Sequence, residues 1–420
     1  MPTSYHLSSI YCPLPVKLGR EEGMHVGDGA HLALWMKAPF QFAAALLFLS
    51  GVSLPLAGQE EGGVRKFIRR YVERVMGEGA DPSAPKFINY PTLAYTPETS
   101  WEFGVSSLYV YSANRDLNNR LSEVKAFTFY TLENQYGISL DHALYTDRNK
   151  WFFYGQVRYQ SFPLFFHGVG RDAPADYQSR IDGAYILLRE RILRETLPSL
   201  YVGLELDFQA LNRVRYTESS QAQPEFAVPS VGAAGSTNMG VGLGVLYNDI
   251  HNALNPRQGH YSEWALLSYS SSTGSAFSFT SYVVDNRIYL PIKENSVLAA
   301  QLYGQFTLGN PPFNMLALMG GGTLMRGYYR GRYRDQHLLA GQIEYRILPF
   351  SFSKRFGASA FLATGQVFGD ARPFTWRRLL PAGGAGLRFL LFPDKDIYAR
   401  FDLAFTQEGR GIYISIGEAF

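Results

Sequence analysis

The residue best suited to chemistry in this sequence is an arginine inside a glycine-rich stretch. Residues 320–335 run Gly-Gly-Gly-Thr-Leu-Met-Arg-Gly-Tyr-Tyr-Arg-Gly-Arg-Tyr-Arg-Asp, which places Arg326 among five glycines. Glycine allows the tight turns and close backbone approach that a loop folded into a protein interior requires. A guanidinium keeps its charge and offers five fixed donors, so away from solvent it needs a carboxylate. We therefore expect a buried ion pair at Arg326; the alternative is an exposed basic loop.

Enzymatic chemistry has little support in the sequence. It contains no Gly-x-Ser-x-Gly elbow, no His-Glu-x-x-His pair and no phosphate-binding loop. The only cysteine is Cys12, which excludes a disulfide or a thiolate metal site within the chain. A Ser/His/acid set assembled from scattered strands, as in a barrel phospholipase, is the least favoured alternative. We predict no catalytic, cofactor-binding or metal-binding residue, although five histidines follow residue 58: His142, His167, His251, His260 and His337.

The amino-acid composition favours a transmembrane β-barrel. Of 420 residues, 15% are aromatic, 41 are glycine and 18% are charged, below the roughly 25% usual in soluble domains. A mean hydropathy of −0.12 excludes a bundle of membrane helices. A hydrophobic fraction of 46% excludes a disordered chain, and a net charge of +3 gives no support for nucleic-acid binding. A barrel with lipid outside and water inside combines many aromatic residues and glycines with few charges and intermediate hydropathy.

From about residue 96 the hydrophobic pattern has the period of two that is typical of strands. In Leu200–Ala210 the even positions are apolar up to Phe208, and the opposite face carries Glu205, Asp207 and Gln209. Such lengths suit tilted strands that cross a bilayer, and charges in mid-strand suit a wet lumen. Three further runs alternate in the same way: Trp151–Gln160, Leu339–Ile347 and Ile397–Thr406.

We predict an all-β protein, a sixteen-stranded antiparallel transmembrane β-barrel over residues 96–420. An even number of strands is expected of a bacterial single-chain barrel. The predicted strands are 101–112, 121–132, 134–146, 150–161, 178–192, 199–211, 238–249, 259–272, 277–290, 295–308, 313–319, 336–347, 356–368, 383–392, 396–406 and 411–420.

The residues before the barrel divide into three predicted parts. Residues 1–35 have no clear pattern, and we interpret them as an extension upstream of the true start at Met36. Residues 36–58 have a positive start, a short apolar core and small residues at the end, as a signal peptide has. Residues 59–95 are predicted to be a short periplasmic segment. In it, an apolar stripe at helical spacing over 64–76 indicates an amphipathic helix with a basic opposite face.

The end of the chain resembles a signal for outer-membrane assembly. An alternating last strand closes on an aromatic residue, and the side chains predicted to share its apolar face are Ile412, Ile414, Ile416 and Phe420. Glu418 departs from this pattern, because it would place a charge on the apolar face. The cost of that charge is small only at the membrane interface.

The arginine-containing stretch resembles the inward-folded sixth extracellular loop of the BamA/TamA outer-membrane protein superfamily, whose barrels are of the bacterial surface antigen type. That loop has the form hydrophobic-Arg-Gly-aromatic, which matches Met325, Arg326, Gly327 and Tyr328. The resemblance extends to three further segments and covers residues 96–420: Pro91–Trp101, Phe165–Gly170 and Ile414–Phe420.

The resemblance implies partners for Arg326. In the family this arginine pairs with acidic side chains on the next two strands, and the first of these matches Glu344. The second would be the Asp of an aromatic-x-Asp-x-Gly motif, but Ala363 occupies that position in Phe361–Gly365. The anchor of the loop is then either weaker than in the family or completed by Asp402.

The resemblance also implies a function in inserting or translocating outer-membrane proteins. Clients would pass a weak seam between the first predicted strand, Trp101–Ser112, and the last, Gly411–Phe420. Gly411 and Gly417 would weaken strand pairing there, and an unpaired edge can template a client strand. We expect as partners outer-membrane lipid, unfolded outer-membrane proteins and assembly machinery, with no nucleic acid and no cofactor. The expected location is the outer membrane of a Gram-negative bacterium.

A passive pore or a structural barrel is the alternative function. Transport members of the family carry periplasmic POTRA domains before the barrel, and residues 59–95 are too few for one. We therefore expect a short branch of the superfamily without POTRA domains. The lack of these client-binding domains and the substitution at Ala363 both favour the alternative.

Overall fold

The computed structural model describes the chain over residues 81–96, 100–161, 163–173, 179–217 and 231–420. The predicted extension at 1–35, the signal peptide at 36–58 and the amphipathic helix at 64–76 lie outside these residues. Within the described part of the chain, no helix combines the length and the apolar character needed to cross a membrane. The helical structure described there consists of six single 3₁₀ turns.

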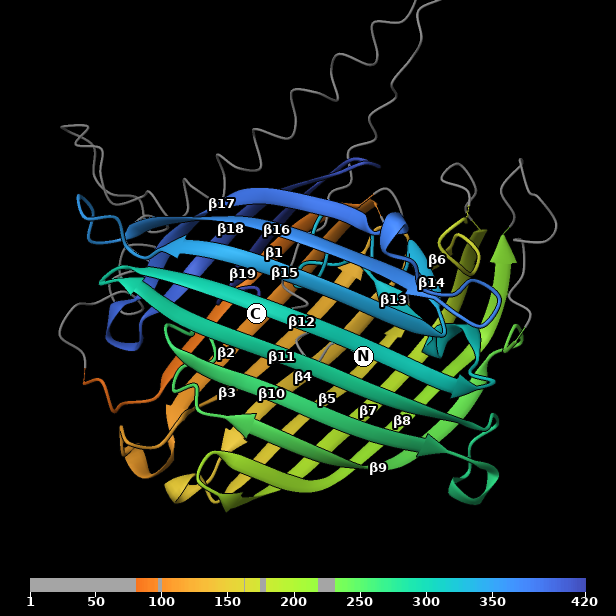
Figure 1. Ribbon diagram of the computed structural model, residues 1–420, viewed down its shortest axis with the longest axis horizontal. Helices are drawn as coiled ribbons and strands as arrows, with labels where there is room; N and C mark the ends of the chain where they lie inside the picture. Colours follow the sequence, from red (N-terminus) through yellow and green to blue (C-terminus); the bar gives the residue numbers. More distant parts are fainter. Residues whose placement is uncertain (1–80, 97–99, 162, 174–178, 218–230) are drawn as a thin grey trace, which may run out of the picture.

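Most of the described chain forms one antiparallel sheet of seventeen strands (Figure 1). Two short strands, β13 (Ala317–Met319) and β14 (Tyr333–Asp335), pair with each other apart from it. The strands of the large sheet are β1 (Lys86–Thr96), β2 (Ser100–Ser112), β3 (Leu121–Thr131), β4 (Tyr136–Tyr145), β5 (Trp151–Ser161), β6 (Leu164–Phe166), β7 (Ser179–Leu197), β8 (Leu200–Thr217), β9 (Ser236–Asn248), β10 (Gly259–Tyr269), β11 (Phe279–Lys293), β12 (Ser296–Gly309), β15 (His337–Ile347), β16 (Phe356–Phe368), β17 (Leu380–Phe392), β18 (Ile397–Thr406) and β19 (Arg410–Ile416).

Each long strand pairs with the next long strand along the chain, from β1 through to β19. β6 continues the edge of β5 along β7, so the seventeen strands occupy sixteen positions. Figure 1 shows the sheet curling round on itself as a barrel. Among the described residues, no ladder of hydrogen bonds joins β19 to β1. A seam therefore separates the first strand from the last.

The barrel begins earlier in the chain than predicted. β1 covers residues 86–96, most of which the sequence places in the periplasmic segment 59–95, so Trp101–Ser112 belongs to the second strand. Pro91 in the middle of β1 explains the error, because proline cannot donate to a ladder and argues against a central strand. β1 is an edge strand at the seam, and an edge tolerates proline.

The predicted strand at 313–319 is wrong, whereas the other fifteen predicted strands overlap strands of the sheet. Phe313–Met315 form a buried 3₁₀ turn, and β13 pairs with β14 inside the connection from β12 to β15. The apolar side chains of this segment pack in the interior of the barrel. The segment therefore has the apolar composition of a strand, although it is not part of the barrel wall. The count of sixteen positions holds because β1 replaces this segment.

The two faces of the sheet differ in the way that a lipid exterior and a polar interior require. On β8, Val202 and Leu204 are exposed on the outer face, whereas Glu205, Asp207 and Gln209 are buried on the inner face. The inner wall is thus lined with charged and amide side chains that pair across strands, as in outer-membrane barrels.

The two ends of the barrel differ in the length of their connections. At one end, two-residue turns join β7 to β8 and β11 to β12, and β19 runs toward this end. At the opposite end, the connection from β12 to β15 takes residues 310–336. Short turns are typical of the periplasmic side of outer-membrane barrels and long loops of the extracellular side. We use these names for the two ends.

Candidate functional site

The connection from β12 to β15, which we call the inward loop (residues 310–336), folds into the barrel. Met325, Arg326 and Tyr328 are each at most 1% exposed. Met325 and Tyr328 join one apolar cluster with side chains of the barrel wall on β12, β15, β16 and β17, among them Tyr303, Leu338, Ala340, Val367 and Ala382. Apolar packing therefore positions the loop against these four strands.

Glycine at position 327 is required by both the backbone and its surroundings. Gly327 has φ of +104°, which favours glycine, and a Cβ there would lie 2.5 Å from Cγ2 of Thr406 on β18. Its backbone N–H donates to the hydroxyl of Tyr413 on β19 at 2.8 Å. The backbone of the loop therefore lies directly against side chains of β18 and β19.

Arg326 is held by groups from three strands. Its Nη1 donates to Oδ2 of Asp402 on β18 at 2.6 Å, and its Nη2 donates to Glu344 on β15. The guanidinium also lies over the ring of Phe361 on β16, with Cζ 3.5 Å from the ring centroid. Burial alone would lower the pKa of Arg326, but Glu344 and Asp402 outweigh burial and raise the pKa above its ordinary value. Arg326 is therefore charged and doubly paired.

Asp402 supplies the carboxylate that Ala363 lacks. Ala363 on β16 is buried and packs in the same apolar cluster as Met325. Gly386 lies opposite Asp402 in the β17–β18 ladder and leaves space for the carboxylate. A Cβ at Gly386 would lie 2.0 Å from Oδ1 of Asp402. The second anchoring acid thus comes from β18 in this chain.

Arg326 belongs to a larger group of buried charges near the periplasmic half of the lumen, which we call the inner ion cluster. It contains four arginines and three carboxylates, each at most 3% exposed: Arg326, Arg346, Arg388, Arg400, Glu344, Asp402 and Glu418. Removing ions from water is costly, and mutual pairing with good geometry offsets that cost. The cluster therefore depends on each member for its stability.

Arg388 and Arg346 connect the cluster. From β17, Arg388 donates through Nη1 to Asp402 at 2.7 Å and through Nε to Glu418 at 2.9 Å. From β15, Arg346 donates through Nε to Glu344 at 2.8 Å. Neither arginine was predicted from the sequence as part of the site, although each alternates with outward apolar neighbours. This alternation could have identified both arginines in the sequence, because a charge on the inner face of a barrel strand needs a partner there.

The last four residues of the chain leave the β19 strand and turn into the barrel. Gly417 has φ of +88°, and its N–H donates to the carbonyl of Tyr398 at 2.8 Å. Beyond this turn, the N–H of Glu418 donates to the carbonyl of Leu254 at 2.9 Å. Ala419 and Phe420 then pack on the opposite wall, in a cluster with Ile250, Tyr289, Val297 and Ala299.

This turn corrects the predicted face of the C-terminal pattern. Ile412, Ile414 and Ile416 alternate along β19, but Phe420 lies beyond the strand and is 3% exposed inside the barrel. Glu418 likewise lies in the inner ion cluster and not on an apolar face. The alternation fails because Gly417 takes a left-handed backbone conformation that ends the strand.

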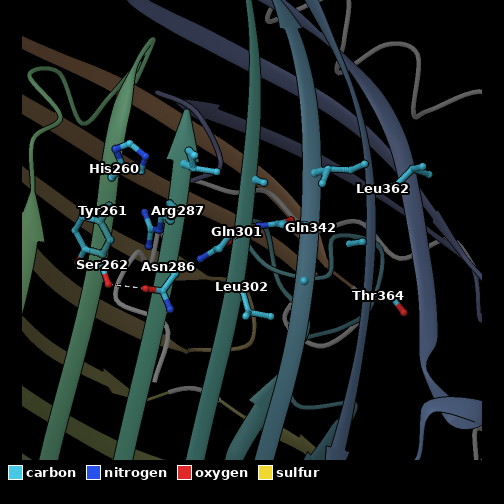
Figure 2. Close-up of a pocket in the computed structure, with 15 residues that line it drawn as sticks. His260, Tyr261, Ser262, Asn286, Arg287, Gln301, Leu302, Gln342, Leu362 and Thr364 are labelled. Carbon is cyan, nitrogen blue, oxygen red and sulfur yellow. Dashed lines mark hydrogen bonds between the residues drawn. The ribbon is translucent and has the colours of Figure 1, made fainter. Parts of the chain in front are cut away.

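Further polar contacts fix the inward loop to the same side of the barrel. The hydroxyl of Tyr328 donates to the carbonyl of Pro381 on β17 at 2.9 Å. Nε2 of Gln342 on β15 donates to Oε1 of Gln301 at 2.6 Å (Figure 2) and to the carbonyl of Thr323 in the loop at 2.8 Å. Together with Arg326, these contacts tie the loop to β15, β17, β18 and β19, the strands that lead to the seam.

The segment after β6 covers the outer side of the inward loop. The N–H of Gly170 donates to the carbonyl of Arg334 at 2.7 Å, and Nη2 of Arg334 donates to the carbonyl of Phe165 at 2.9 Å. The ring of Tyr329 lies 6.0 Å from that of Phe165. Two of the segments that carry the family resemblance, far apart in sequence, therefore contact each other.

Three of the described histidines contact an acid or a backbone group. His142 pairs with Glu190, His260 lies near Asp249, and His337 accepts from the backbone of Thr307. In the described part of the chain, no group of three or more His, Cys, Asp or Glu side chains has the arrangement of a metal site. The chemistry assembled around Arg326 is that of ion pairing.

A sixteen-position antiparallel sheet, an outward apolar face and an inward loop held by an arginine define an outer-membrane β-barrel. Residues 127–420, more than half of the chain, match the model of the Omp85 superfamily domain. The chain belongs to the Omp85 superfamily, whose relatives of known structure are barrels of the Gram-negative outer membrane. No curated protein matches the sequence directly.

Two solved structures with TM-scores above 0.5 are similar in fold, and a third aligns with a lower score. CdiB from Escherichia coli aligns with a TM-score of 0.52 and 10% identity, over 86% of this chain and 72% of that chain. CdiB from Acinetobacter baumannii aligns with a TM-score of 0.51 and 12% identity, over 87% and 70%. BamA from Haemophilus ducreyi lacking POTRA domains 1–3 gives a TM-score of 0.48 and 12% identity, over 86% and 80%. At these identities the similarity concerns the fold alone.

Proposed function

We propose that this protein assists the insertion or translocation of outer-membrane proteins through the seam between β1 and β19. The observation that carries the proposal is the unpaired boundary between these strands beside an anchored inward loop. An edge strand presents free N–H and C=O groups that can template an incoming strand. A client hairpin could therefore pair with the barrel at the seam before it leaves into the bilayer.

The composition of both edges supports a weak seam. Pro91 removes one donor from β1, and β19 is only seven residues long, with Gly411 near its start. A Cβ at Gly411 would lie 2.7 Å from the hydroxyl of Tyr413, so this glycine makes room for the ring that reaches the inward loop. Strand pairing at the seam is thus limited, whereas contact with the loop is retained.

Side-chain contacts at the periplasmic end hold β1 near the strands on the other side of the seam. Lys86 at the start of β1 lies 3.3 Å from Asp394, in the turn between β17 and β18. The side chain of Lys395 donates to the carbonyl of Pro82 at 3.1 Å. Tyr90 of β1 and Ile416 of β19 pack against the same apolar cluster. At its periplasmic end, the seam is therefore bounded by side-chain contacts and not by backbone hydrogen bonds between strands.

The first test of the proposal is the folding rate of a small unfolded barrel protein in liposomes, with and without this protein. We expect acceleration by the wild type and none by R326A, because the arginine anchors the loop to the strands beside the seam. Heat-modifiable migration on gels should show R326A inserted as a folded barrel. Equal acceleration by R326A, or none by the wild type, would overturn the proposal. In the second case a steady, Arg326-independent conductance would support the passive pore.

A further inference from the structure

A titratable pair lies on the outer, lipid-facing wall of the barrel. His142 on β4, Gly155 on β5 and Glu190 on β7 are directly opposite one another in the two ladders. Nε2 of His142 lies 3.2 Å from one carboxylate oxygen of Glu190. The side chains retain 15% and 27% exposure, respectively. Their strand positions alternate with the inward residues Asp141 and Arg191, so both face the bilayer.

Gly155 is necessary for this pair to form. A Cβ at position 155 would lie 2.2 Å from Oε2 of Glu190 and 2.4 Å from Cε1 of His142. The two side chains therefore meet across a strand that has no side chain between them.

The surroundings of the pair are apolar. The outward side chains next to it on the three strands are Leu140, Leu144, Phe153, Val157, Leu188 and Ile192. Trp151, four positions before Gly155 on β5, is exposed at the periplasmic end. At ~3.3 Å per residue and a strand tilt of ~40°, the pair lies about 10 Å into the bilayer from this tryptophan.

An ionisable pair at that depth is costly and marks a functional site by default. The proposed insertion activity does not use it, because β4, β5 and β7 lie on a different part of the wall from the seam. The apolar neighbours supply no nucleophile, which argues against a catalytic dyad. Among the residues that the structure describes, His142 and Glu190 have each other as their polar contact. Hydrogen-bonding capacity on both groups therefore remains directed at the bilayer.

We propose that the β4–β5–β7 wall is the contact surface of a two-fold symmetric dimer with a second copy of this chain. A two-fold interface brings one patch against itself, so it requires a patch that is self-complementary. A histidine beside a glutamate meets this requirement, because His142 of each copy can face Glu190 of the other. Gly155 places no side chain between the paired groups and a facing wall, and the surrounding apolar side chains provide the packing that joins membrane proteins.

The test is dimer formation in phosphatidylethanolamine–phosphatidylglycerol vesicles, measured by energy transfer between labelled copies at increasing protein density. We expect wild-type dimers and a dissociation constant about tenfold higher for H142L and for E190L, since each removes two symmetric polar contacts. N286L is the matched control. Asn286 forms another outward polar pair, accepting from Ser262 at 2.5 Å on a separate part of the wall (Figure 2). This variant should dimerise as the wild type does.

A complementation experiment separates a direct contact from a general effect on stability. H142E carries two acids at the site and E190H carries two imidazoles, so neither should pair well with itself. Mixed in equal amounts, the two variants should form heterodimers with an affinity near that of the wild type. A monomeric wild type, wild-type affinity in both leucine variants, or failure of folded H142E and E190H to associate when mixed would each overturn the proposal.

Discussion

At the scale of single residues, Asp402 and Glu344 are the two carboxylates that each contact three arginines of the inner ion cluster, and Asp402 is the one that the family pattern lacks. It contacts Arg326, Arg388 and Arg400 at 2.6, 2.7 and 3.0 Å. Breaking a buried ion pair by removing one partner costs roughly 3–5 kcal/mol, because the other charge is left buried without compensation. We expect D402N to lower the free energy of unfolding of the barrel in urea by an amount of that order, measured as loss of heat-modifiable migration.

The control for this prediction restores an acid on β16, which is separated from β18 by β17. Ala363 lies on β16, at the position where the family pattern has an aspartate, and it packs beside Met325. In a D402N background, A363D should recover part of the lost stability, because position 363 is two residues along β16 from Phe361, over whose ring the Arg326 guanidinium lies. Wild-type stability of D402N alone, or no recovery in the double variant, would show that the anchor is not held by charge at these positions.

The residue chemistry was predictable in part. The glycine-rich stretch and the family resemblance indicated Arg326 and Glu344, and the sequence left Asp402 as one of two possibilities. Arg388 and Glu418 were not predicted as partners. Their contact depends on the barrel register and on the turn at Gly417, and neither is encoded in the local pattern.

At the scale of the elements, the C-terminal segment after β19 is where the structure differs most from the alternating pattern. We expect a bimane-labelled cysteine at Ile414, on the outer face of β19, to be quenched by a lipid-soluble nitroxide. The same label at Phe420 should be shielded, because that residue packs against Tyr289 inside the barrel. Equal quenching at both positions would mean that the segment continues as a strand along the membrane.

Two segments were assigned wrongly from the sequence, each for an identifiable physical reason. A proline in mid-segment made β1 appear unsuited to a sheet, although an edge strand accommodates it. The opposite error occurred at 313–319, where apolar residues pack inside the barrel as part of the inward loop and not in its wall. Periodicity reports which residues avoid water, but it does not distinguish a wall strand from a loop folded against that wall.

At the scale of the whole molecule, the barrel combines a well-paired wall with one unpaired boundary. Fifteen successive ladders connect β1 to β19 around the barrel wall. The inward loop is fixed to the strands that end at the seam. This arrangement concentrates any opening between β1 and β19. The inner ion cluster joins β15, β17, β18 and the segment after β19, which all lie on one side of the seam, so opening at the seam can leave these pairs intact.

If clients use the seam, a covalent bridge across it must block their insertion. In a chain whose only cysteine is removed by C12S, Y90C and I416C place thiols on the two edges that share an apolar cluster. A short bismaleimide joins them. The control bridge uses N89C and S107C, which are opposite each other in the β1–β2 ladder. We predict that the seam bridge abolishes acceleration of client folding in liposomes and that the control bridge does not. Full acceleration by the seam-bridged protein would contradict the account.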